Sequence, residues 1–299
     1  MVPIIKQPIA AAVLVAATMV PTTASAAPTA NCALGVGSVT AGGDHTAQVV
    51  VATKPPTARA KETTAKDVYA PGQIRVSASM NVLDDGFGGV NVFGYVIGGS
   101  TLYASGYHAT NGVHDGAPLA PIGGGWGSFV SLEEADYQGP TQTHITRRNT
   151  YALRNDGTLF RWTLVNGAWR YRASAPGFAA VKTMALVSKS ATYDTFVATT
   201  RGGALYTIHV PTSTPMKPVV KRVRSSTWQG FETLLAQKCG VYGTFLVGID
   251  HDTNSAYAYA VGRFNGASTV IQGLGKIPGT FPDALYFRWK DPGAPLTGE

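Results

Sequence analysis

The sequence lacks the short motifs by which most hydrolases, kinases and dehydrogenases are recognised. It has no Gly-x-Ser-x-Gly elbow, no His-Glu-x-x-His zinc motif, no phosphate-binding loop and no Gly-x-Gly-x-x-Gly fingerprint. No two of its six histidines stand three or four residues apart, the spacing that places two metal ligands on one helix face. Motifs therefore predict no catalytic residue, no metal site and no cofactor.

Long apolar runs are absent beyond the N-terminal segment. Residues 1–26 begin with the basic Lys6, continue through an apolar stretch at residues 9–20 and end in Ala24-Ser25-Ala26. These are the charged, apolar and small-residue parts of a secretory signal peptide. A membrane anchor is the alternative, but a bilayer requires about 20 apolar residues. We predict a secreted, extracellular chain that matures at Ala27 and has no membrane span.

Cysteine is scarce as well, since the chain has only two, Cys32 and Cys239. In the oxidising environment of a secreted protein, a pair of cysteines more often forms a disulfide than two free thiols. A lipidated Cys32 is the alternative, but Thr29-Ala30-Asn31 before it does not fit a lipidation box. We predict a bond between Cys32 and Cys239.

Charged residues make up only 14% of the chain, whereas 35 glycines and 18 prolines indicate many turns. The formal net charge is +7, and basic residues are densest at residues 217–224. Such a stretch on a strand is often a solvated edge that discourages pairing with other chains. Attraction to anionic glycans or acidic cell-wall polymers is the functional alternative. Nucleic acid is not predicted as a partner of a secreted protein.

A pattern of apolar residues returns about every fifty positions. Its first members are Trp126, Phe178, Trp228 and Phe281, spaced 52, 50 and 53 residues apart, and further apolar residues follow each at i+3 and i+6. That spacing also fits a helix, but Pro282 would interrupt one and glycine is dense nearby. Repeats of this length with several short strands are typical of β-propeller blades. We therefore expect each aromatic residue to lie in a loop that leads into an inner strand.

The repeat predicts an all-β chain in which residues 27–299 form one β-propeller domain, with a polar loop near residues 54–68. Counting units gives five blades, with four or six still open. The apolar run at residues 281–289 begins a unit that the chain does not finish. We therefore expect this C-terminal strand to pair with N-terminal strands and so close the ring, which removes exposed edges. Residues 292–299 are expected to contribute little to stability.

Two parts of the repeat resemble a known family. Trp126-Gly-Ser-Phe129, followed by Asp156-Gly157-Thr158-Leu159-Phe160, is similar to a blade of the tachylectin-type propeller lectins. The resemblance covers roughly residues 90–289 and implies a five-bladed propeller that binds N-acetylated sugars in shallow sites on its blades. It makes Trp126, Asp156 and Trp228 the candidate carbohydrate-binding residues. For both tryptophans, packing between blades is the alternative.

These observations together predict a secreted, monomeric, non-catalytic carbohydrate-binding propeller for N-acetylated or anionic glycans. Two other functions remain open on the same scaffold. One is a protein-binding scaffold. The other is a glycoside hydrolase or lyase, because paired acids such as Asp84-Asp85 and Glu133-Glu134 could supply the two carboxylates that glycosidases use.

Overall fold

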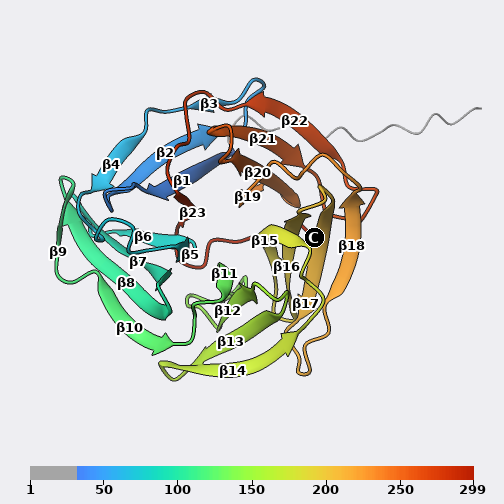
Figure 1. Cartoon of the computed structure of the whole chain (residues 1–299), viewed down its shortest axis with the longest axis horizontal. Coiled ribbons are helices and arrows are strands. Elements are labelled where there is room, and N and C mark those ends of the chain that lie inside the picture. The colour runs from blue at the N-terminus through green and yellow to red at the C-terminus, as the bar shows by residue number, and fades with distance from the viewer. Residues whose placement is uncertain (1–31) are drawn as a thin grey trace, which may run out of the picture.

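The computed structural model describes residues 32–299, and the predicted signal peptide lies outside the described residues. All assigned elements in the described part are β-strands, which Figure 1 shows gathered into sheets around a central axis, as in a β-propeller. No helix among residues 32–299 is long and apolar enough to cross a membrane. The predicted all-β class is therefore confirmed.

Three of the sheets are four-stranded antiparallel meanders that follow one another along the chain. The first contains β11 (Phe129–Tyr137), β12 (Arg147–Arg154), β13 (Leu159–Val165) and β14 (Ala168–Ala175). The second contains β15 (Val181–Lys189), β16 (Tyr193–Thr200), β17 (Leu205–Pro211) and β18 (Val219–Arg224). The third contains β19 (Thr233–Cys239), β20 (Gly243–Asp250), β21 (Ser255–Val261) and β22 (Ile271–Lys276). In each sheet the first strand lies nearest the axis (Figure 1).

The remaining eleven strands form one sheet that consists of two groups. One group contains β1 (Ala33–Val39), β2 (His45–Val51), β3 (Thr57–Ala58) and β4 (Glu62–Ala65). The other contains β5 (Val76–Ser77), β6 (Met80–Asp84), β7 (Gly89–Gly98), β8 (Thr101–Thr110), β9 (Val113–Asp115) and β10 (Leu119–Gly124). The last strand of the chain, β23 (Leu285–Lys290), lies between β1 and β6 and joins the two groups.

Strand β23 carries the C-terminus back to the N-terminal part of the domain, near the axis in Figure 1. It pairs with β1 in antiparallel register from Gly35↔Trp289 to Val39↔Leu285. It also pairs in parallel with β6, where Trp289 faces Met80. The prediction that the C-terminal strand pairs with N-terminal strands is confirmed, and both edges of β23 are used.

The repeated aromatic residues lie in turns that lead into the innermost strands. The backbone N–H of Phe129 donates to the carbonyl of Trp126 at 3.1 Å, and Val181 donates to Phe178 at 3.0 Å in the same way. Each turn therefore brings a large ring to the start of β11 or β15, where it packs against the neighbouring sheet. The expectation of a loop in place of a helix is confirmed.

The predicted polar loop near residues 54–68 is only partly a loop. It contains the short strands β3 and β4, which both pair with the outer side of β2. Polar residues suit this position because an edge strand has one side in water. The sequence pattern did not predict these strands because their residues become strands only by hydrogen bonding to β2.

Residues 292–299 are packed against the domain, whereas the sequence predicted that they contribute little to stability. Leu296 is 1% exposed and lies in a core cluster with residues of β12 and β15. The backbone of this segment bonds Lys189 and Val187 of β15 and also Phe264. The segment thus bridges sheets, a role that only tertiary contacts reveal.

The disulfide between Cys32 and Cys239 is present and links the residue before β1 to the end of β19. The two cysteines are 207 positions apart in the sequence, so the bond links the start of the described chain to the sheet that contains β19.

We expect non-reducing peptide mapping of the protein to recover one linked peptide pair containing Cys32 and Cys239. The bond should form because the fold holds the two Cα atoms 5.3 Å apart, a separation that suits a disulfide. Complete alkylation of both thiols without a reductant would contradict this expectation.

Candidate functional site

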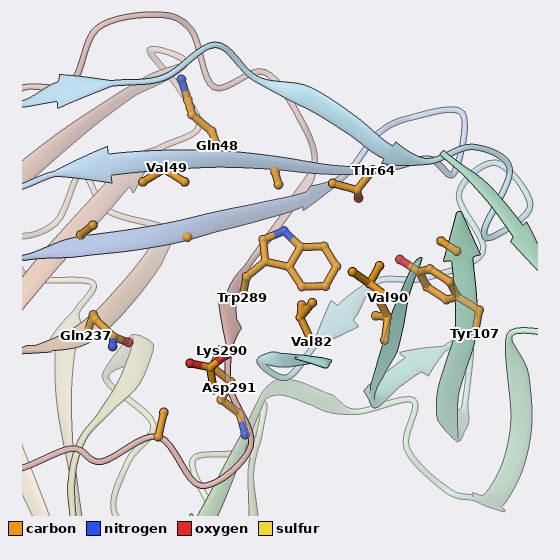
Figure 2. A pocket seen from close by; sticks show the side chains of 16 residues that line it. Gln48, Val49, Thr64, Val82, Val90, Tyr107, Gln237, Trp289, Lys290 and Asp291 are labelled. Carbon is orange, nitrogen blue, oxygen red and sulfur yellow. The ribbon is translucent and has the colours of Figure 1, made fainter. Parts of the chain in front are cut away.

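The main candidate site is a cavity of about 400 Å³ between the two strand groups of the eleven-stranded sheet (Figure 2). One wall is formed by β1 and β2, the other by β6, β7 and β8, and Trp289 of β23 stands between them. Volumes of this order are typical of small-molecule sites, which are mostly apolar with a few polar groups. The lining side chains used below are Gln48, Thr64, Val82, Val90, Val92, Tyr107, Ala109, Gln237, Trp289 and Asp291.

The indole of Trp289 is held in a fixed position within this cavity. Its Nε1–H donates to the carbonyl of Thr46 at 2.9 Å, and the Phe287 ring packs edge-on with centroids 4.8 Å apart. Gly35 faces Trp289 across the β1–β23 pair, and a Cβ at Gly35 would lie 3.0 Å from that of Trp289. Because Gly35 has no side chain, the Trp289 side chain has room beside it. The indole therefore forms a preformed flat surface within the cavity.

An uncharged wall faces the indole. Val82 and Val90 lie on the side toward which the ring points, with Tyr107 behind them (Figure 2). The Tyr107 hydroxyl is 2.7 Å from Nδ1 of His45. Burial lowers the pKa of His45 to about 3, with a further contribution from His114, and burial raises the pKa of Tyr107. Both groups are therefore neutral at ordinary pH, and this wall carries no charge.

Polar groups lie around the rest of the cavity. Gln48 donates from Nε2 to the carbonyl of Arg59 at 3.0 Å, which orients its amide, and Thr64 donates to the carbonyl of His45 at 3.2 Å. Gln237 accepts from Arg288 at 3.3 Å through Oε1, which leaves its amide N–H groups as donors. Amides, a hydroxyl and the nearby Asp291 carboxylate can bond several hydroxyl groups of one ligand.

A second, smaller recess of about 290 Å³ lies between the β7–β8–β10 strands and the β11–β12 strands. Its charged groups are Glu134 and Arg148, and its lining also includes Ser105, Phe93 and Tyr95. The Tyr95 ring packs edge-on against Trp169 with centroids 4.9 Å apart. Arg148 donates from Nε to Asp136 at 2.7 Å. Burial raises the pKa of Glu134, and burial together with Glu134 raises the pKa of Tyr95 to about 12. This recess combines a ring with a donor and an acceptor.

The three residues suggested by the lectin resemblance lie apart from both recesses. Trp126 is 8% exposed and packs against Trp162 with centroids 4.8 Å apart, between the β7–β8 strands and the β11–β12 strands. Trp228 is 5% exposed and packs against Tyr259 at the same separation, between the second and third four-stranded sheets. Both positions match the packing alternative, and a sugar contact by either ring stays a prediction.

Asp156 lies in the turn between β12 and β13 and is partnered locally. Arg154 donates from Nε at 2.9 Å, and the backbone N–H of Thr158 donates at 2.9 Å. The Arg154 hydrogen bond, followed by that from Thr158, holds the pKa of Asp156 well below its usual range. Gly157 has φ +82, and a Cβ there would lie 2.1 Å from the backbone nitrogen of Ala179. The Asp-Gly pair is thus required by the turn, and its binding role stays a prediction.

Sequence reasoning did not single out Trp289, Gln48, Gln237 or Arg148, and it named Glu134 only as one of the paired acids of the glycosidase alternative. Trp289 belongs to the apolar run used to predict ring closure, so its presence in a strand was foreseen but its orientation was not. The other four belong to different strands, and the recesses arise only when those strands become neighbours. One feature of the sequence did point to these recesses, namely a charged residue inside an apolar strand, such as Glu134.

No protein-family model matches the chain, and no curated protein matches it. Among solved structures, it is similar to a lectin of Aleuria aurantia, described as a six-bladed β-propeller with a fucose recognition mode. That match has 12% identity and a TM-score of 0.48, and it covers 88% of this chain and 81% of the lectin. A mutant of AofleA from Arthrobotrys oligospora has 11% identity and a TM-score of 0.45 over 81% of this chain and 75% of its own. The periplasmic gluconolactonase of Pseudomonas aeruginosa has 10% identity and a TM-score of 0.38 over 84% and 98%. Similarity at this level assigns neither a family nor a ligand to the chain.

Proposed function

We propose that the chain is a secreted five-bladed β-propeller that binds carbohydrates without turnover, in recesses between neighbouring blades. The five blades are the three four-stranded sheets and the two strand groups joined by β23. Secretion is supported by the N-terminal segment of the sequence and by the disulfide. We take the protein to act as a monomer.

The observation that carries the proposal is the fixed Trp289 ring in a cavity with an apolar wall and polar groups around it. A pyranose has a face of C–H groups that packs on an aromatic ring, whereas its hydroxyls need donors and acceptors at the edge. Gln48, Gln237 and Thr64 offer both kinds of group. Water excluded from the indole face would add the hydrophobic part of the binding free energy.

The proposed ligand is an N-acetylated sugar, with anionic glycans as a further class. The methyl of an acetamido group fits the apolar wall of Val82, Val90 and Val92, while its amide matches the side chains of Gln48 and Gln237. A net charge of +7 favours glycans with acidic groups and acidic cell-wall polymers through long-range attraction. The Tyr95 recess, with Arg148 and Glu134, is proposed as the second site.

We expect the protein to bind N-acetylated glycans on an array and to show two sites per chain by calorimetry. Trp289→Ala should weaken one site at least tenfold, or about 1.4 kcal/mol, because the platform is lost. Gln48→Ala should weaken the same site with little effect on folding. Melting curves of both variants would separate loss of binding from loss of structure.

Asp156→Asn is the matched variant at the position suggested by the lectin resemblance. Binding that is unchanged in Asp156→Asn and reduced in Trp289→Ala would support the inter-blade cavity. The reverse result would support the turn site. Absence of any glycan binding would favour the protein-binding scaffold, and turnover of chromogenic glycosides would favour the hydrolase.

A further inference from the structure

A separate cavity of about 200 Å³ lies at the axis, among the inner strands, where it is distinct from the inter-blade recesses. Residues of β5, β11, β15, β19 and β23, and residues just before these strands, contribute to its wall. Its volume equals roughly seven waters at about 30 Å³ each, which is enough for a small molecule and too little for a glycan chain. The ionisable residues on its wall are Arg75, Glu133, Lys182, Glu232, His251, Tyr286 and Arg288.

Most of these charged groups are already engaged. Arg75 donates to three backbone carbonyls, those of Gly99, Phe129 and Trp126. Lys182 pairs with Glu232 and also donates to the carbonyl of Gln229. These contacts join neighbouring inner strands and leave little capacity for a ligand. Arg288 differs from them.

Arg288 is 4% exposed, and among residues 32–299 only one of its terminal nitrogens donates a hydrogen bond. Nη1 donates to the carbonyl of Ala236 at 2.7 Å and to Oε1 of Gln237 at 3.3 Å. Nε and Nη2 donate to no residue among 32–299, yet neither is a fully enclosed atom, so both keep access to open space. Nε and Nη2 form the side of the guanidinium that binds a carboxylate with two parallel hydrogen bonds. A buried cation with free donors is costly unless an acceptor is supplied.

Glu133 lines the same wall as Arg288, and the two side chains interact electrostatically. Burial raises the pKa of Glu133 to about 7, against the opposing effects of Arg288 and Lys290 of β23 and the backbone N–H of Leu186 of β15. The neighbouring carboxyl of Glu134 adds slightly to the rise. Below this pKa the group is mostly protonated, so it offers an O–H donor and does not neutralise Arg288.

We propose that the axial cavity binds a small organic acid through its carboxylate, with Arg288 as the bidentate partner and the Glu133 carboxyl as a second donor. Hydroxyls of Ser131 and Thr183 on the same wall suit a hydroxy acid. The site contains neither Trp289 nor Tyr95, and Arg288 touches the Trp289 cavity only through its bond to Gln237.

The test is calorimetric titration of the full-length secreted protein with acetate, L-lactate and gluconate at about pH 6. We expect at least one of these acids to bind, and Arg288→Met to weaken it at least tenfold. Arg222→Met, on the exposed strand β18, changes the net charge equally and should leave the affinity unchanged. Glycan binding should persist in Glu133→Gln, because Glu133 lines neither sugar recess, and this separates the proposal from the one above.

The pH dependence supplies a second readout that does not require Arg288 to be replaced. Because the ligand is an anion, its affinity should fall as pH rises through about 7, when Glu133 ionises. Glu133→Gln should bind with an affinity that no longer changes over this range. The other ionisable groups on the wall are those of Arg75, Lys182, Glu232, His251 and Tyr286, and burial raises the pKa of Tyr286 above its ordinary value.

Three results would overturn the proposal. The first is no binding of any of the three acids at millimolar concentration. The second is inorganic phosphate binding as tightly as the acids, which would indicate general anion attraction. The third is an unchanged pH dependence in Glu133→Gln, which would assign the titration to another group and remove Glu133 from the site.

Discussion

Removal of residues 281–299 is expected to abolish cooperative folding of the whole domain. The deletion removes β23, which pairs with both β1 and β6, and exposes the edges of both strands. It also removes the buried side chains of Phe281, Tyr286 and Phe287, each worth about 1.5 to 3 kcal/mol on full burial. A domain's net stability is only about 5 to 15 kcal/mol, so these losses alone are comparable with the total. Circular dichroism on heating should show no cooperative transition.

Removal of residues 292–299 is the matched, smaller deletion. From the sequence it was expected to be nearly neutral, but the buried Leu296 and the backbone bonds to β15 now predict a lower melting temperature. A native melting temperature after the larger deletion would show that the last strand does not hold the ring closed. A native melting temperature after the smaller one would show that the terminal segment is dispensable.

Lys290→Met is expected to lower the free energy of unfolding by about 3 to 5 kcal/mol. The Lys290 side chain is 1% exposed, and Nζ donates to Asn81 at 2.7 Å and lies 3.4 Å from Glu134 and 3.5 Å from Asp136. Those two carboxyls are 2% and 0% exposed and belong to the neighbouring sheet. Without Lys290 the two carboxyls share Arg148 as their remaining ion-pair partner among the described residues. One cation does not compensate two buried carboxylates, and a buried charge that loses its partner is strongly destabilising. Chemical denaturation would measure the loss.

Lys61→Met is the control, because it removes the same side chain from an ion pair near the surface. Lys61 lies 3.0 Å from Asp283, with 36% of its side chain exposed. Solvent screens such a pair, so the expected change is below about 1 kcal/mol. An equal decrease in the free energy of unfolding in the two lysine variants would contradict the stabilising role that we assign to the buried cluster of Lys290, Glu134 and Asp136.

Several elements could be predicted because their signals are local. The turn before β11 was predicted from Trp126 and Phe129, and the Asp156-Gly157 pair indicated the tight turn between β12 and β13 because few residues accept a positive φ there. The disulfide followed from a count, since two cysteines allow only one pairing. The last strand was predicted from an apolar run that began a repeat and left it incomplete.

Other features could not be predicted because each depends on which strands become neighbours. Glu133 and Glu134 are adjacent in the sequence, yet Glu133 faces the axial cavity with Arg288 of β23, whereas Glu134 bonds Asn81 of β6 and lines an inter-blade recess. Successive side chains of a strand point to opposite faces of the sheet, so two adjacent residues have different neighbours. The strand alone does not determine which residues those neighbours are.

The sequence by itself determined the β class, the repeating unit, the tight turns and the cysteine pair, because backbone sterics and the period of apolar residues act over a few positions. The tertiary structure decided that Trp126 and Trp228 pack between sheets, that Trp289 forms a cavity, and that Lys290 is enclosed with Glu134 and Asp136. The Trp289 cavity and the Lys290 cluster join residues more than a hundred positions apart, and the other two tryptophans join neighbouring sheets. The burial and the partners of these residues follow from the order of sheets around the axis, which no short stretch of the chain encodes.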